Sequence, residues 1–131
     1  MKYIMVSRVY PAYHPKAGQP TGFRASILAG RKIHTLRNSA GNRNTGDIVS
    51  LREWQDKPYR SKQIEFARCE ILVVQERLIG SVSDYFIKNV ADLDGFADPK
   101  DFQYWFTQGR DEAIDFTGVC IWFIDVKECT A

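Results

Sequence analysis

The sequence predicts a mixed α+β fold in which β-structure dominates: a small mixed β-barrel with two or three short flanking helices. Three observations lead to this prediction. The chain has 131 residues, the size of one domain, so we expect a single domain over residues 1–131. Strand-like segments number about five, more than the helix-like ones. Short helices fall between short strands without an internal repeat, which favours a barrel over a doubly wound sheet.

The N-terminal part predicts a strand, a loop and a helix. Residues 2–9 alternate apolar and polar side chains, as a strand does. Residues 10–22 contain three prolines and two glycines, a composition typical of a loop. Thr21 is the expected N-cap of a short helix over residues 22–30, and Gly30 is its expected left-handed stop.

The middle of the chain predicts three strands. Residues 32–37 have β-branched and apolar side chains at alternate positions, and residues 38–47 form a polar loop rich in Asn and Gly. A second strand over residues 48–54 and a turn over residues 55–59 follow. Residues 63–79 are β-rich and alternate at first, which indicates one long or bent strand.

The C-terminal part predicts two helices and a last strand. Residues 81–96 are expected to form a short helix and a loop. Asp98 is a good N-cap, Pro99 suits the first helical position, and Gly109 ends the second helix. Residues 118–126 are rich in β-branched and aromatic side chains and predict the final strand.

Charge is distributed unevenly along the chain, although the net charge is only +2. Residues 1–23 carry three cations and no acid, and residues 24–68 carry ten cations against four acids. Residues 69–131 carry five cations against twelve acids. The asymmetry fits a basic face for an anionic partner such as nucleic acid, and it fits equally two halves that attract each other in the fold.

Location and metal content are predicted from what the sequence lacks. No apolar run approaches the ~20 residues that span a membrane, and the N-terminus shows no signal-peptide pattern, so we expect a cytoplasmic protein. Cys69, Cys120 and Cys129 are odd in number and widely spaced, and the chain has only two histidines. We therefore expect free thiols, no metal and no cofactor.

The segment "GRKIHTLR" concentrates groups that can do chemistry. Residues two apart on a strand share a face, so Thr35 and Arg37 are expected to point together, with Lys32 curling to the same side and Arg31 at the rim. A desolvated lysine can act as a base toward a hydroxyl, and a guanidinium can bind an anion. The alternative is structural: cations after a helix C-terminus are favourable to the helix dipole, and the threonine is an ordinary strand residue.

The run "ILAGRKIHTLR", followed by "NTGDIVSL", resembles the ASCH domain, a family of the PUA-like superfamily. The family pattern is Gly-x-Lys-x-x-Thr-x-Arg, then a loop, then Gly-Asp before an apolar strand. The resemblance is strong over about residues 24–54. The residues that carry it are Gly30, Lys32, Thr35, Arg37, Gly46 and Asp47.

The resemblance implies a PUA-like barrel with a cleft beside the motif, in a superfamily that often binds RNA. One bacterial branch is an amidohydrolase that removes the acetyl group from N(4)-acetylcytidine, with the motif lysine, the threonine and a later glutamate as the proposed catalytic group. Carried over, these are Lys32 and Thr35. At the place of the glutamate, the nearest carboxylate in this chain is Asp94, with Asp92 beside it.

Residues 52–63 form a second candidate site. Trp54 and Tyr59 alternate with cations that include Arg60 and Lys62. Aromatic rings can stack on exposed bases while cations contact phosphates. Equally, the rings can anchor a hairpin to the core while the cations are solvated.

Other notable side chains are expected to be structural. The aromatic stripe of the second helix, formed by Phe102, Trp105 and Phe106, is expected to pack in the core. His34 is expected on the strand face opposite Thr35. Tyr10, Tyr13 and His14 of the proline-rich loop are expected to be solvent-exposed, the alternative being that they close over the cleft.

Three functional hypotheses follow. The first is a domain that binds RNA, a nucleotide or a modified nucleoside in a basic cleft. The second is an amidohydrolase in which Lys32 is the base, Thr35 the nucleophile, Asp94 the orienting carboxylate and Arg37 the electrostatic support. The third is a protein-interaction module. The sequence leaves the oligomeric state open.

Overall fold

The computed structural model describes residues 1–79 and 84–129. One strand and one helix come first, three consecutive strands follow, and two consecutive helices precede the last strand. The elements are β1 (Tyr3–Met5), α1 (Phe23–Leu28), β2 (His34–Arg37), β3 (Ile48–Trp54), β4 (Gln63–Ile79), α2 (Asp84–Leu93), α3 (Pro99–Phe106) and β5 (Phe116–Glu128).

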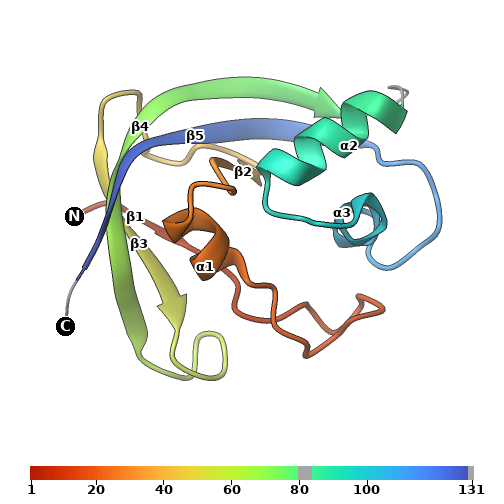
Figure 1. Cartoon of the computed structure of the whole chain (residues 1–131), viewed down its shortest axis with the longest axis horizontal. Coiled ribbons are helices and arrows are strands. Elements are labelled where there is room, and N and C mark those ends of the chain that lie inside the picture. Colours follow the sequence, from red (N-terminus) through yellow and green to blue (C-terminus); the bar gives the residue numbers. More distant parts are fainter. Residues whose placement is uncertain (80–83, 130–131) are drawn as a thin grey trace.

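The strands form one sheet that curls into a half-barrel. The order is β1-β3-β4-β5-β2, with β1 parallel to β3 and every other pair antiparallel. The long strands β4 and β5 pair with two register shifts, and such irregularities bend a sheet. Figure 1 shows the sheet arching over α1, with α2 and α3 beyond it on the concave side. The strands β1 and β2 are therefore the two edges of the half-barrel.

The core fills the concave side of the sheet. Ile4, Leu51, Phe66 and Ile121 are buried on four different strands, and Phe102 of α3 is fully buried among the helices. Burial of such side chains contributes about 1.5–3 kcal/mol each. The predicted mixed α+β fold is confirmed at this level, as a five-stranded half-barrel with three helices in the described residues. No helix found there is long and apolar enough to span a bilayer.

The structure confirms Gly30 and Asp98 as helix ends and contradicts Thr21 as an N-cap. Gly30 adopts the left-handed conformation with φ +77°, and the Asp98 side chain accepts from the Lys100 N–H, as a cap does. The N-cap of α1 is Gly22 rather than Thr21. The Thr21 hydroxyl instead donates to the Ser7 carbonyl at 2.7 Å, so it ties the start of α1 to the strand segment before the loop.

The proline-rich loop is attached to α3, contrary to the expectation that its aromatic residues are solvent-exposed. Tyr10 and His14 are buried, and only Tyr13 stays partly exposed. The Tyr13 hydroxyl donates to the Trp105 carbonyl at 2.8 Å.

Gly109, the predicted end of α3, follows the C-cap Thr107 by two residues, and the first left-handed residue after the helix is Gln108, with φ +55°. A side chain at Gly109 would collide with the Tyr13 carbonyl, so this glycine lets the loop approach.

Candidate active site

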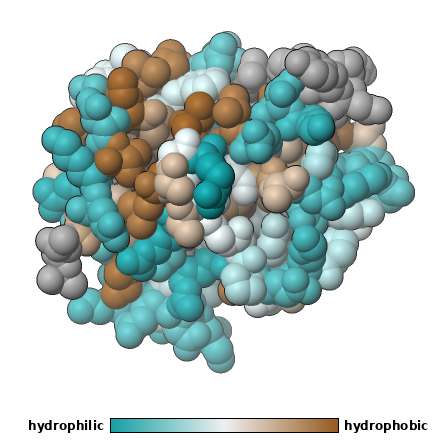
Figure 2. All heavy atoms as spheres, viewed as in Figure 1, coloured by the Kyte–Doolittle hydropathy of each residue, from teal (hydrophilic) through white to brown (hydrophobic). Residues whose placement is uncertain are grey.

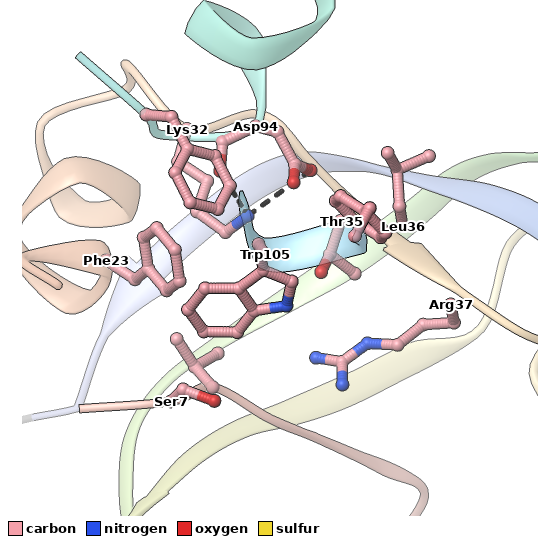
Figure 3. A pocket seen from close by; sticks show the side chains of 11 residues that line it. Ser7, Phe23, Lys32, Thr35, Leu36, Arg37, Asp94 and Trp105 are labelled. Carbon is pink, nitrogen blue, oxygen red and sulfur yellow. Dashed lines mark hydrogen bonds and ion pairs between the residues drawn. The ribbon is translucent and has the colours of Figure 1, made fainter. Parts of the chain in front are cut away.

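A small pocket lies near the two edges of the half-barrel, close to the place where β1 and β2 come nearest. Its volume is about 50 Å³. Figure 3 shows Thr35 and Arg37 on one side of the pocket and the rings of Phe23 and Trp105 on the other, with Ser7 and Lys32 close to the rings. It is lined by Val6, Ser7, Phe23, Lys32, Thr35, Leu36, Arg37, Asp94, Phe96, Trp105 and Phe106.

Lys32 is buried at the inner end of this pocket, with 3% of the residue exposed. Its ammonium donates to the backbone carbonyls of His34 at 2.9 Å and Asp94 at 2.6 Å. The carboxylate oxygen Oδ1 of Asp94 lies 3.4 Å away. The ring of Phe23 lies 4.8 Å from Nζ, within the range of a cation–π contact. Three acceptors and one aromatic face therefore fix this side chain in place.

The surroundings of Lys32 shift its pKa. Burial lowers the pKa of the ammonium, because removing a charge from water disfavours the charged form. The Asp94 carboxylate opposes this effect, and the nearby Arg37 guanidinium adds to it. The net direction is downward from 10.5, which makes this lysine a stronger candidate for a base than a solvated one.

His34 holds Asp94 in position. Its ring nitrogen Nδ1 lies 2.9 Å from Oδ1 of Asp94, and both side chains are almost completely buried. An ionised carboxylate can only accept, so Nδ1 carries the proton in this contact. Lys32 and His34 both approach the same oxygen, Oδ1 of Asp94. The Nε2 atom of His34 is buried without a hydrogen-bond partner.

This role of His34 was missed at the sequence level. The alternation along residues 32–37 correctly places His34 and Thr35 on opposite faces of the segment. It also places Lys32 and His34 on the same face. The end of α2 brings Asp94 to that side of the segment. The spacing of two between Lys32 and His34 was the available signal that these two side chains lie on the same side of the segment.

Gly95 makes room for the lysine. Its φ of +94° lies in the region that favours glycine. A Cβ built at this position would lie 2.9 Å from Cδ of Lys32 and 3.2 Å from its Cβ and Cγ. The residue after Asp94 must therefore be glycine both for its backbone conformation and for contact with the lysine stem.

Thr35 and Arg37 line the pocket from β2, as the alternation predicts. Figure 3 shows the Thr35 hydroxyl and the Arg37 guanidinium turned toward the same space. Arg37 donates through one terminal nitrogen to the Met5 carbonyl, a bond that joins β2 to β1 across the open side of the half-barrel. Its Nε is buried without a partner. Burial lowers the pKa of Arg37, with a smaller effect of the same sign from Arg43.

The opposite wall is aromatic. Phe23, Phe96, Trp105 and Phe106 all line the pocket. The expectation that the stripe of α3 is core packing is right for Phe102 and incomplete for Trp105 and Phe106, which pack against the core and also face this space. The reason is that the pocket opens directly into the aromatic core.

The structure brings together four of the nine predicted site residues: Lys32, Thr35, Arg37 and Asp94. Arg31 is exposed and does not line the pocket, because the turn after Gly30 carries it outward. The other four lie on or beside the turn between β3 and β4, outside the pocket; they are Trp54, Tyr59, Arg60 and Lys62.

Among the residues that the structure describes, no group of three or more His, Cys, Asp or Glu side chains is arranged to hold a metal ion. Cys69, Cys120 and Cys129 form no disulfide. Comparisons with protein-family models, with curated proteins and with solved structures gave no match.

Proposed function

We propose that this protein is an ASCH-type, PUA-like domain that binds a nucleoside or nucleotide through the pocket. The observation that carries the proposal is the convergence of Lys32, Thr35 and Arg37 with Asp94 on one enclosed space. The first three are the motif residues through which the sequence resembles that family. The fourth stands near the place of the family's glutamate.

The pocket offers the groups that a base edge needs. The unpartnered Nε of Arg37 is a donor, the Thr35 hydroxyl is a donor or an acceptor, and the Asp94 carboxylate is an acceptor. The ring of Trp105 supplies an apolar face against which a planar group can stack. A cytosine that carries an exocyclic amide presents both a donor and acceptors on one edge, so its chemistry is complementary.

The size of the pocket limits what enters it. Pockets that enclose a drug-sized ligand measure roughly 300–1,000 Å³, and this one measures about 50 Å³. Only a small group on the base, such as an acyl substituent, fits inside. The sugar of the nucleoside then lies outside, at the mouth.

Calorimetric titration with N(4)-acetylcytidine and with cytidine tests the proposal. We expect the acetylated nucleoside to bind at least about tenfold more tightly, because its acyl group fills the pocket. Arg37→Lys removes the planar donor and should lower the affinity at least about tenfold, and Thr35→Val should lower it about fivefold.

Arg31→Lys is the matched control for the arginine, because Arg31 is exposed outside the pocket. Its affinity should equal that of the unchanged protein. If both pocket variants bind the acetylated nucleoside as the unchanged protein does, while keeping the same melting temperature, the pocket is not the binding site.

A second candidate function is hydrolysis of the same amide. The observation that favours it is the buried Lys32, whose pKa is lowered, in one pocket with the Thr35 hydroxyl. A neutral amine keeps two N–H donors, which match the two carbonyls that Lys32 already contacts. Its lone pair is then free to accept a proton.

In this mechanism Lys32 takes the proton of the Thr35 hydroxyl as its oxygen attacks the acyl carbon. Arg37 stabilises the oxyanion that forms. The C–N bond breaks, and the leaving nitrogen of the base receives the proton from Lys32. Water, deprotonated by Lys32, then hydrolyses the threonine ester, which releases a carboxylic acid and restores the hydroxyl.

Incubation with N(4)-acetylcytidine, followed by quantification of cytidine and acetate, tests the hydrolase. We expect turnover that Thr35→Val abolishes, and a rate that rises with pH as Lys32 loses its proton. Binding without turnover would leave the first candidate alone. Turnover that persists in Thr35→Val would exclude the threonine as nucleophile.

A further inference from the structure

We infer that His34 is a positioning residue for the proposed hydrolysis. Its ring holds the Asp94 carboxylate in a hydrogen bond of its own, which keeps that carboxylate from forming a close ion pair with the Lys32 ammonium. Lys32 can then release its proton and act as a base. The inference rests on the second candidate function, in which Lys32 accepts the proton of Thr35, and it adds a residue that does not line the pocket.

Two donors compete for one oxygen of the Asp94 carboxylate. Nδ1 of His34 lies 2.9 Å from Oδ1, and Nζ of Lys32 lies 3.4 Å from the same atom. A hydrogen bond between an ammonium and a carboxylate is ordinarily about 2.7–2.9 Å long. The short contact with the carboxylate therefore belongs to the histidine, and the ion pair of the lysine is longer than usual.

The position of Lys32 does not depend on this ion pair. Backbone carbonyls of His34 and Asp94 accept from Nζ at 2.9 Å and 2.6 Å, both shorter than its distance to Oδ1. A neutral amine still has two N–H groups for these two carbonyls. Loss of the proton therefore gives up only the long contact with the carboxylate.

The other histidine of the chain lies in a cluster without this restraint. His14 contacts the backbone carbonyl of Asp101, and Lys16 lies 2.6 Å from the carboxylate of the same residue. The hydrogen bond to Asp101 raises the pKa of Lys16, whereas burial lowers the pKa of Lys32. Burial is the larger cause of this difference. The longer distance to the carboxylate acts in the same direction, because the attraction between charges weakens with distance.

The His34 ring makes this hydrogen bond at the expense of its other nitrogen. The residue is fully buried, and Nε2 has no hydrogen-bond partner among the residues described. The ring packs edge-on against Trp122 of β5, with 4.6 Å between the ring centroids. A buried nitrogen without a partner destabilises the fold, and an apolar side chain would avoid this loss. A histidine at this place therefore points to a function for Nδ1.

The charged and titratable groups described around the Lys32 ammonium come from three directions. Asp94 directly follows α2, His34 and Arg37 lie on β2, and Cys120 lies on β5. Asp94 and Cys120 favour the charged lysine, and Arg37 disfavours it. Figure 1 places the end of α2 beside β2 near the centre of the view, and Figure 2 shows mostly apolar and weakly polar side chains around that centre. In such surroundings the distance between Asp94 and Lys32 is the feature that a neighbouring donor can change.

Carbon-13 NMR of protein labelled at its lysine side chains tests the inference without any nucleoside. The Cε resonance that is lost in Lys32→Met reports the pH at which this amine loses its proton. His34→Leu removes the donor and fills its space, so the carboxylate can approach the ammonium. The midpoint of the Lys32 titration should then rise by about one pH unit or more, as expected for an opposite charge at close range. His34→Asn retains an N–H donor near the place of Nδ1 and should restore most of the original midpoint.

Two further variants control for loss of packing. His14→Leu removes the other buried histidine, whose ring contacts a backbone carbonyl, and should leave the Lys32 midpoint unchanged. Asp94→Asn removes the negative charge while His34 stays in place, and should lower the midpoint. In the hydrolase assay, the acid limb of kcat/KM against pH should move upward in His34→Leu by the same amount as the midpoint.

A measurement on the unchanged protein needs no variant. Nitrogen-15 shifts of the His34 ring show which nitrogen carries the proton, and we expect it on Nδ1. A proton on Nε2 would overturn the inference, because Nδ1 could then not donate to the carboxylate. This measurement and Asp94→Asn keep the inference testable if His34→Leu does not fold.

The remaining outcomes separate the inference from the proposed function. An unchanged midpoint in folded His34→Leu, or equal rises in His34→Leu and His34→Asn, overturns the inference. Hydrolysis whose rate falls at every pH in His34→Leu, without movement of the acid limb, also overturns it and leaves the function standing. Midpoints that move as expected without any hydrolysis of N(4)-acetylcytidine support the control of Lys32 by His34 and refute the second candidate function.

Discussion

Both histidines of the chain lie in clusters with one lysine and one aspartate, and the two clusters differ in what they leave unsatisfied. One attaches the proline-rich loop to α3, and the other lies at the pocket. We call them the loop cluster and the pocket cluster. The loop cluster is Lys16, Asp101 and His14, and the pocket cluster is Lys32, Asp94 and His34.

In the loop cluster each of these polar groups has a partner. The Lys16 ammonium lies 2.6 Å from Oδ2 of Asp101, and 44% of the lysine side chain is exposed. His14 contacts the Asp101 carbonyl through Nε2, and its Nδ1 accepts from the Lys16 N–H at 3.0 Å. The hydrogen bond to Asp101 raises the pKa of Lys16. This cluster stabilises a loop, and none of its buried side-chain atoms lacks a hydrogen-bond partner.

In the pocket cluster the same residue types are buried beside empty space. The pKa of Lys32 moves downward rather than upward, because desolvation is its largest cause. The Nε2 of His34 and the Nε of the neighbouring Arg37 lack partners. The difference shows that a set of residue types does not define a site. A site is defined by the burial of those residues, by an adjoining cavity and by donors that lack a partner.

The largest expected effect comes from removing each lysine. Lys32→Met leaves the Asp94 carboxylate buried without its cation, and should lower the free energy of unfolding by about 3–5 kcal/mol. Lys16→Met removes a partly exposed ion pair, which is worth about 0–1 kcal/mol. Urea denaturation measures both.

The double variant Lys32→Met with Asp94→Asn separates loss of packing from loss of charge pairing. It should recover part of the stability lost in Lys32→Met, because no unpaired charge remains. Similar losses for Lys32→Met and Lys16→Met would show that the two clusters are energetically alike.

A smaller effect is expected at the glycine beside the pocket cluster. Gly95→Ala combines a positive φ with contact against the lysine stem, and should cost about 2–3 kcal/mol and weaken ligand binding. Gly30→Ala is the matched control, since Gly30 has φ +77° and no atom within 4 Å of the added carbon. It should cost only the backbone strain of about 1–2 kcal/mol. Equal losses in stability and binding would show that the contact with Lys32 is unimportant.

The smallest effect is a pH dependence of opposite sign in the two clusters. Lys32 has a folded pKa below its unfolded value near 10.5, so its burial penalty is present in full below the folded pKa and is relieved as the pH rises toward 10.5. Lys16 has a raised folded pKa, so its contribution is present below 10.5 and is lost as the pH rises through the folded value.

Unfolding free energies measured from pH 7 to 11 check this prediction. The difference between the unchanged protein and Lys32→Met should increase with pH, by at most about 1.4 kcal/mol per pH unit. The difference for Lys16→Met should decrease at the alkaline end. A flat difference for Lys32 would mean that the Asp94 carboxylate fully compensates its burial.

The local sequence predicted the bounds of the elements well where a single residue determines the local backbone conformation. Gly30 and Asp98 mark helix ends through their own chemistry, and strands β3 and β4 have the predicted bounds. The alternation of β2 also placed Thr35 and Arg37 on one face. The attachment of the proline-rich loop to α3 was not predictable, because it depends on partners about 90 residues away.

The site was predictable only in part for the same reason. Lys32 and Asp94 are separated by 62 residues, and no local pattern states that the end of α2 returns to β2. Likewise, the buried state of His34 depends on Asp94 and on the ring of Trp122, which lies 4.6 Å away on β5. Tertiary packing supplies these contacts, and the resemblance to a family supplied the expectation that a carboxylate stands there.

The bond from Arg37 to the Met5 carbonyl gives the pocket a mechanical consequence. This hydrogen bond links the two edge strands of the half-barrel, β1 and β2, and the same guanidinium is a donor that a ligand would engage. A ligand that draws the Arg37 guanidinium into the pocket would break its hydrogen bond to β1. A ligand that accepts only from Nε would leave that hydrogen bond intact. Deuterium uptake by the first six amides of the chain would therefore report how the pocket is occupied.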